Sequence, residues 1–103
     1  MKLWIDDVRP APEGYFWAHS VEDAKYHIKW WEQHVIPHGE VLELIDIDHD
    51  AGDFAHDGGD FIKLLDWFEE TGRNYPIHIH SMNPVGVANM RAIIERNDWT
   101  EVR

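Results

Sequence analysis

The feature that most constrains this chain is the alternation of short apolar segments with amphipathic ones. Apolar runs of strand length lie at residues 2–5, 15–18, 41–48 and 76–80. Apolar residues recur at helical spacing over residues 21–35, 61–71 and 84–94. Strands that alternate with amphipathic helices indicate an α/β fold with a mostly parallel sheet. A length of 103 residues is typical of one domain, so a single domain over residues 1–103 is expected.

The boundaries of these elements carry their own signals. Ser20 is a typical N-cap, Gly72 stands where a C-cap belongs, and Asn83 followed by proline is typical of a helix start. The segment between the first two strands is too short for a full helix. The first helix is therefore predicted to be reduced or missing, and the direction of the second strand stays open. Residues 98–103 could form a further short strand.

The composition of the chain excludes some classes of function and favours others. Asp and Glu number 20 against 9 Lys and Arg, a formal net charge of −11. This charge opposes binding to duplex DNA and suits a cation site, although a merely soluble acidic surface fits it too. The absence of cysteine excludes thiolate metal sites and thiol catalysis. No apolar run approaches the roughly 20 residues of a membrane helix, so a cytoplasmic location without membrane contact is expected.

The six tryptophans are predicted to be mostly core, the alternative being a base-stacking platform.

Acids and histidines gather directly after three of the predicted strands. They are Asp6-Asp7, Asp48-His49-Asp50 and His80-Ser81. In parallel α/β sheets, ligands bind at the carboxyl ends of the strands. The sequence therefore predicts that these three segments form one site.

The carboxylates predict a divalent cation, Mg²⁺ or Mn²⁺, as cofactor. Asp6 and Asp7 repel each other unless a positive charge lies nearby, and oxygen donors suit these ions. The alternative is that one of the two is only a turn residue. Asp48 could ligate the metal or act as nucleophile or general base. Asp50 is a fourth candidate ligand, although with Gly52 it could form an Asx-type turn.

The histidines are candidate acid–base residues. His80 could protonate a leaving oxygen or bind a softer metal such as Mn²⁺ or Zn²⁺, or be a hydrogen-bonded residue under the sheet. His49, next to Asp48, joins it among the candidate catalytic residues. His78 shares a strand face with His80 because side chains alternate. Asp46 stands two residues before Asp48, so Asp46 and His78 are predicted to form a buried pair one layer below the site.

The start of the last helix is a predicted phosphate cradle. Free backbone N–H groups at a helix N-terminus favour an anion, and Ser81, Asn83 and Gly86 lie there. Asn83 could instead be only the cap. Asn89 could reach the same pocket, although a solvated surface position fits as well. Arg9 could bind a phosphate through two hydrogen bonds or form a surface ion pair.

Three motifs span nearly the whole chain. They are LWIDDVRPAP at residues 3–12, IDHDAG at 47–52 and IHSMNPVGVANM at 79–90. Together they resemble the receiver fold of two-component signalling, and more closely its compact branch, the cyclic-phosphate-processing receiver-like family. The resemblance implies a three-layer, flavodoxin-like sheet. The family's acidic pair, acceptor Asp and Ser/Thr positions correspond to Asp6-Asp7, Asp48 and Ser81.

The resemblance implies a role in sensing or hydrolysing cyclic phosphates, such as the 2′,3′-cyclic ends left by RNA cleavage. The expected partner is a small phosphorylated or cyclic-nucleotide ligand, or an RNA end. A non-catalytic metal or nucleotide sensor and a signalling receiver stay open as alternatives. No lysine follows Lys63, so the lysine of ordinary receivers is missing and stable aspartyl-phosphate signalling is not expected. Asp46 also departs from the family, in which its position is usually non-acidic.

Overall fold

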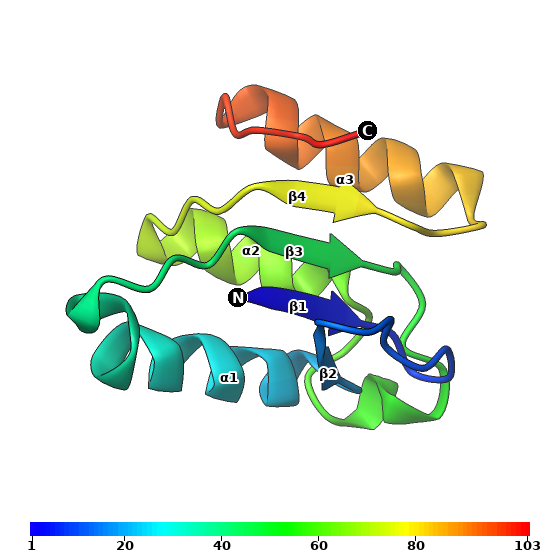
Figure 1. Ribbon diagram of the computed structural model, residues 1–103. Helices are drawn as coiled ribbons and strands as arrows, with labels where there is room; N and C mark the ends of the chain where they lie inside the picture. Colours follow the sequence, from blue (N-terminus) through cyan, green and yellow to red (C-terminus); the bar gives the residue numbers. More distant parts are fainter.

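Four short strands form one parallel sheet in the order β2–β1–β3–β4, as Figure 1 shows for the computed structural model, which describes residues 1–103. The strands are β1 (Lys2–Ile5), β2 (Phe16–Ala18), β3 (Leu44–Ile47) and β4 (Ile77–Ile79). The α-helices are α1 (Val21–His34), α2 (Ile62–Thr71) and α3 (Pro84–Arg96). Two 3₁₀ turns, η1 (Ile36–His38) and η2 (Gly52–His56), lie in the connections. The predicted α/β receiver-like fold is confirmed.

The link between β1 and β2 confirms that the first helix is missing. Residues 6–15 join two parallel neighbours without forming a helix, and Leu3 pairs with Phe16. The amide of Tyr15 donates to the carbonyl of Pro12 at 3.1 Å, and Gly14 takes a φ of 87°, which glycine adopts without strain. A tight turn before β2 thus reverses the chain within a link shorter than most parallel crossovers. The direction of β2, open from the sequence, is parallel to β1.

The helices share one face of the sheet. The crossovers from β2 to β3 and from β3 to β4 advance in the same direction, so the right-handed rule puts α1 and α2 on the same side. Helix α3 packs beside α2, and all three contribute to one cluster of 19 buried apolar residues. On β1 and β3 the residues of that cluster alternate along the chain, and the strand residues in it are Leu3, Ile5, Ala18, Ile45, Ile47 and Ile77.

The opposite face of the sheet is thinly covered. Trp4, Asp46 and His78 lie side by side across it, in register on β1, β3 and β4. The layer over this face is reduced to the β1–β2 link, whose Tyr15 ring packs edge-on against Trp4 with 6.0 Å between ring centroids. The missing helix therefore leaves Trp4 and His78 partly exposed, whereas Asp46 between them is 5% exposed.

The predicted helix caps are confirmed. The Oγ of Ser20 accepts a hydrogen bond from the amide of Asp23 at 3.0 Å and donates to Asp57 at 2.7 Å. Gly72 ends α2 with a φ of 72°, and Asn83 caps α3. None of the helices combines the length and the apolar character that crossing a lipid bilayer requires.

Some predicted boundaries and positions need correction. Residues 98–103 form no strand, and a single parallel bridge joins Ile77 to Glu101, because β4 itself offers only a three-residue ladder. Strand β3 begins at Leu44 rather than at residue 41. Of the six tryptophans, only Trp31 is buried. Trp67 and Trp99 pack against the edge of the core and stay partly exposed, and Trp30 lies on the exposed side of α1.

We expect Ser20→Ala to lower the free energy of unfolding by about 1–2 kcal/mol, because it removes an N-cap from a buried position. Thr71→Ala is the control, since it removes an exposed hydroxyl that bonds to its own helix at Trp67, and we expect it to change stability by less than about 0.5 kcal/mol. Urea unfolding followed by circular dichroism measures both variants. Equal losses would argue against a specific capping role for Ser20.

Candidate functional site

Three carboxylates meet at the carboxyl edge of the sheet. Strands β1 and β3 are neighbours with Ile5 beside Ile47, so the residues that follow them leave from the same end, as the arrowheads in Figure 1 show. Asp6, Asp7 and Asp48 place carboxylate oxygens within 4.8 Å of one another. These three residues are called the acidic cluster below. The structure thus brings together three of the four predicted metal ligands.

Asp6 is fully buried at the back of the acidic cluster. Its Oδ1 accepts hydrogen bonds from the amides of Val8 at 2.9 Å and Arg9 at 2.8 Å. Its Oδ2 lies 3.0 Å from Nε2 of His80. Burial alone would raise the pKa of Asp6, but the hydrogen bonds from Arg9, Val8 and His80 outweigh it and hold the pKa below its usual 3.8. Asp6 is therefore an ionised carboxylate whose oxygens are already partnered.

Asp7 is less buried and shows the opposite shift. Burial raises the pKa of Asp7; its own backbone amide opposes this, and the negative charges of Asp6 and Asp48 add to it. A Cβ added at Gly52 would lie 2.3 Å from Oδ2 of Asp7, and Gly52 has a φ of 54°, so only glycine leaves room for the carboxylate. A carboxylate crowded by two others is one that a bound cation stabilises.

His80 lies between two buried carboxylates. Its Nδ1 is 2.6 Å from Oδ1 of Asp46, and its Nε2 is 3.0 Å from Oδ2 of Asp6. The ring stacks on Trp4 with 3.8 Å between centroids and an interplanar angle of 3°. Burial alone would lower the pKa of His80, but the hydrogen bonds to Asp46 and Asp6 outweigh it and raise the pKa above 6.5. Because ionised carboxylates only accept hydrogen bonds, both ring nitrogens act as donors.

The predicted pair of Asp46 with His78 is wrong. The two residues are cross-strand neighbours, yet Asp46 bonds to His80, while Nδ1 of His78 bonds to the carbonyl of Val102 at 2.8 Å. Asp46 is 5% exposed, so its charge needs a donor that is also inside the protein. The ring of His80, stacked on the sheet, supplies that donor.

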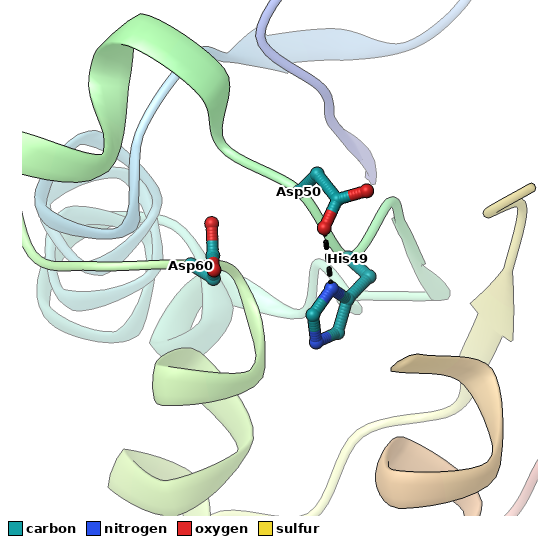
Figure 2. A group of neighbouring side chains, drawn as sticks. All are labelled: His49, Asp50 and Asp60. Atoms are coloured by element: carbon teal, nitrogen blue, oxygen red, sulfur yellow. Dashed lines mark hydrogen bonds and ion pairs between the residues drawn. The ribbon is translucent and has the colours of Figure 1, made fainter. Parts of the chain in front are cut away.

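A second group of titratable side chains, drawn in Figure 2, contains the fourth predicted ligand, Asp50. His49, Asp50 and Asp60 place potential ligand atoms within 4.8 Å of one another. Nδ1 of His49 lies 2.7 Å from Oδ1 of Asp50, and this hydrogen bond lowers the pKa of Asp50. Burial acts in the opposite direction, and the hydrogen bond from Asn83 lowers the pKa further. Asp60 accepts from the amide of Ala51 at 3.1 Å. Asp50 therefore orients an imidazole and stands apart from the acidic cluster.

The predicted phosphate residues are joined by capping contacts at the start of α3. The amide of Asn83 donates to Oγ of Ser81 at 3.1 Å, and Oδ1 of Asn83 accepts from the amide of Gly86 at 3.0 Å. Nδ2 of Asn83 reaches Asp50 at 3.3 Å. A Cβ added at Gly86 would lie 2.4 Å from Cγ of His49. The helix start therefore closes directly on the His49 ring.

The two remaining candidates differ in position. Arg9 lies at the site, where its Nη1 donates to the carbonyl of His80 at 3.3 Å while the side chain stays largely exposed. Asn89 is exposed on α3, and no hydrogen bond joins it to the other site residues. A groove begins at Ser81 and follows α3 as far as Glu95. The structure thus brings Arg9, but not Asn89, into contact with the site.

The profile of the family described as "Cyclic-phosphate processing Receiver domain" matches residues 1–96. The chain belongs to this family. No curated protein and no solved structure matches the chain. In this receiver domain the acidic cluster and the second group occupy the strand ends where the family resemblance implies a site.

Two contributors to the site of this receiver domain lie outside the sequence predictions. Trp4 supports the ring of His80, and Gly52 makes room for Asp7. The alternation of Trp4 with its buried neighbours Leu3 and Ile5 was a usable signal, because it puts Trp4 on the face opposite the core. No local signal places Gly52 against Asp7, since the two belong to different loops.

We expect Gly86→Ala to destabilise the protein by about 1–3 kcal/mol, because the new methyl group overlaps the His49 ring. In a His49→Ala background the same change should become neutral or stabilise by up to about 1 kcal/mol, since alanine is the better helix former. A double-mutant cycle by urea unfolding measures this coupling. The same cost in both backgrounds would contradict the contact.

We expect Asp46→Asn to cost stability in a pH-dependent way, because Asp46 helps raise the pKa of His80 above 6.5. A group whose pKa is raised in the folded state stabilises the protein fully at pH values below its unfolded pKa of about 6.5. This stabilisation is lost once the pH exceeds its folded pKa. Asp6 stays ionised across this range, because its pKa lies below 3.8. The stability difference from the unmodified protein should therefore be largest near pH 6 and shrink as the pH rises through the folded pKa of His80.

Urea unfolding at intervals between about pH 5.5 and 9.5 measures this difference. Asp66→Asn on α2 is the matched control, because it removes the same charge at a partly exposed surface position. A difference for Asp46→Asn that stays constant with pH would contradict the assigned contact.

Proposed function

We propose that this receiver domain binds a cyclic phosphodiester and hydrolyses it with the help of a divalent cation at the acidic cluster. The observation that carries the proposal is the approach of Asp6, Asp7 and Asp48 within 4.8 Å, together with the pairing of His49, the residue after Asp48, with Asp50. The description of the family supplies the cyclic-phosphate class of ligand. A cyclic nucleotide or the 2′,3′-cyclic end of an RNA has this chemistry.

The acidic cluster fits a hard divalent cation such as Mg²⁺ or Mn²⁺. All its donors are carboxylate oxygens, and Gly52 lacks the Cβ that would overlap Oδ2 of Asp7. Asp7 and Asp48 would hold the ion at the open edge, with the buried Asp6 behind them. When bound, such an ion neutralises phosphate charge and lowers the pKa of a water molecule.

His49 is better placed than His80 to protonate the leaving oxygen. Both ring nitrogens of His80 face carboxylates at 2.6 and 3.0 Å, so its protons are already shared. His49 uses Nδ1 for Asp50, and the rest of its ring points away from Asp50 (Figure 2). The bond at Nδ1 fixes the ring orientation and leaves Nε2 as the nitrogen that donates.

The remaining residues hold the phosphate. The hydroxyl group of Ser81 and the N–H groups at the start of α3 would donate hydrogen bonds to its non-bridging oxygens, and Arg9 would add a positive charge. In the hydrolysis, a water oxygen forms a new bond to phosphorus while one P–O bond of the cyclic ester breaks. A proton of the water passes to Asp48, and the released alkoxide takes a proton from His49. The product is a phosphomonoester with a free hydroxyl group.

Binding without turnover is the second candidate function. The observation that favours it is the engaged ring of His80, which leaves the acidic cluster itself without a free imidazole. In that case the domain would sense a cyclic nucleotide or RNA end, and His49 would bind this ligand without donating a proton to it.

Phosphorus NMR of the protein with a 2′,3′-cyclic nucleotide tests the proposal. We expect the cyclic phosphate signal to convert to monoester with Mg²⁺ or Mn²⁺ and to persist with EDTA. Asp48→Asn should slow the conversion by about 100-fold or more, and His49→Gln by about 100-fold, the usual range for acid–base groups. Asp66→Asn removes the same charge on α2 and should leave the rate unchanged.

Line broadening by Mn²⁺ separates the two candidate functions. If the cyclic phosphate signal broadens in the presence of protein and Mn²⁺ but never converts, the domain binds without turnover. If the signal neither broadens nor converts, this ligand class is excluded at the acidic cluster.

A further inference from the structure

Asp46 is a charged residue in the middle of a β-strand, and the proposed reaction gives it no role. It lies on β3, is 5% exposed, and makes its one side-chain contact with Nδ1 of His80 at 2.6 Å. A buried carboxylate is costly in any protein unless it is paired. In a chain with a net charge of −11, its presence directly behind the acidic cluster calls for a physical explanation.

The contact of Asp46 belongs to a closed set of interactions. The ring of His80 stacks on Trp4, and Nε1 of Trp4 donates to the carbonyl of Arg9 at 2.9 Å. The amide of Arg9 in turn donates to Oδ1 of Asp6 at 2.8 Å, and Oδ2 of Asp6 faces His80. Trp4, Arg9, Asp6 and His80 thus form a closed cycle in which each residue contacts two others, and Asp46 adds one hydrogen bond to the His80 ring.

The orientation of His80 decides which carboxylate oxygens remain available. Oδ1 of Asp6 already accepts two backbone hydrogen bonds, and Oδ2 is covered by Nε2 of His80. Asp7 and Asp48 are only half-buried. Oδ1 of Asp48 accepts a hydrogen bond from the amide of His49 at 2.8 Å, but no imidazole covers the carboxylate of either residue as His80 covers that of Asp6. A ring turned away from Asp6 would expose Oδ2 and add a third ligand to the cluster.

We propose that Asp46 is a positioning residue that holds the His80 ring on Oδ2 of Asp6 and so reserves Asp7 and Asp48 as the protein ligands of the cation. This inference rests on the cation site proposed above. Trp4 supports the plane of the His80 ring, and Asp46 fixes the rotation of that ring.

Mn²⁺ binding, followed by the electron paramagnetic resonance signal of the free ion, tests the inference on three variants. Asp46→Asn keeps an acceptor for Nδ1 and should bind Mn²⁺ within about 3-fold of the unmodified protein. The double variant Asp46→Leu/His80→Leu removes both partners of the buried pair and frees Oδ2 of Asp6. It should bind Mn²⁺ about 10-fold more tightly, because affinity rises with the number of charged ligands. His78→Leu changes a histidine on β4, two residues before His80, and should leave the affinity unchanged.

The unmodified protein supplies a second measurement that does not depend on the folding of a variant. Proton and nitrogen NMR of His80 should show a low-field Nδ1–H signal, protected from exchange by Asp46. This signal and the Nε2 resonance should keep their positions when Mg²⁺ saturates the acidic cluster. Weaker Mn²⁺ binding by a double variant with native near-ultraviolet circular dichroism, or displacement of the His80 signals by Mg²⁺, would overturn the inference.

The failure of the proposed function has a different signature. If the unmodified protein binds no Mn²⁺, the cation site itself is absent. If Mn²⁺ binds to the unmodified protein and more weakly to the double variant, the site stands and only the role of Asp46 is refuted.

Discussion

The site depends on one imidazole that two buried carboxylates share. Asp6 directly follows β1, Asp46 lies on β3, and both are nearly inaccessible to water in a chain with a net charge of −11. Neither charge could stay inside without a donor, and His80 offers one nitrogen to each. Through His80 the ends of β1, β3 and β4 are joined at one edge of the sheet, and this edge is where the acidic cluster lies.

The missing first helix has a direct consequence for the chemistry. With the β1–β2 link in place of a helix, the face of the sheet opposite the core carries the partly exposed Trp4 and the buried Asp46 instead of aliphatic residues. Trp4 packs on one side against the link through Tyr15 and on the other against the ring of His80. The face that a helix would have sealed thus becomes the support of the candidate site.

Two groups of side chains divide the candidate functions between them. The acidic cluster holds oxygen donors alone, whereas His49 and Asp50 form a hydrogen-bonded pair under the start of α3, to which we assign the proton transfer of the proposed reaction. Glycine makes each arrangement possible, since Gly52 leaves room for Asp7 and Gly86 for the His49 ring. For a domain of the cyclic-phosphate processing receiver family, charge neutralisation and proton transfer would therefore come from separate, adjoining groups.

The sequence by itself determined the helices, their caps, the parallel α/β class and the strand ends where acids and histidines gather, because periodicity, capping and turn chemistry are local properties. The family followed from its three motifs. Only the tertiary structure decided that β2 runs parallel to β1, that Asp50 stands apart from the acidic cluster, and that Asp46 pairs with His80 rather than with His78. These choices depend on which buried charge meets which donor after the strands have paired, and such contacts join residues far apart in the chain that no local pattern relates.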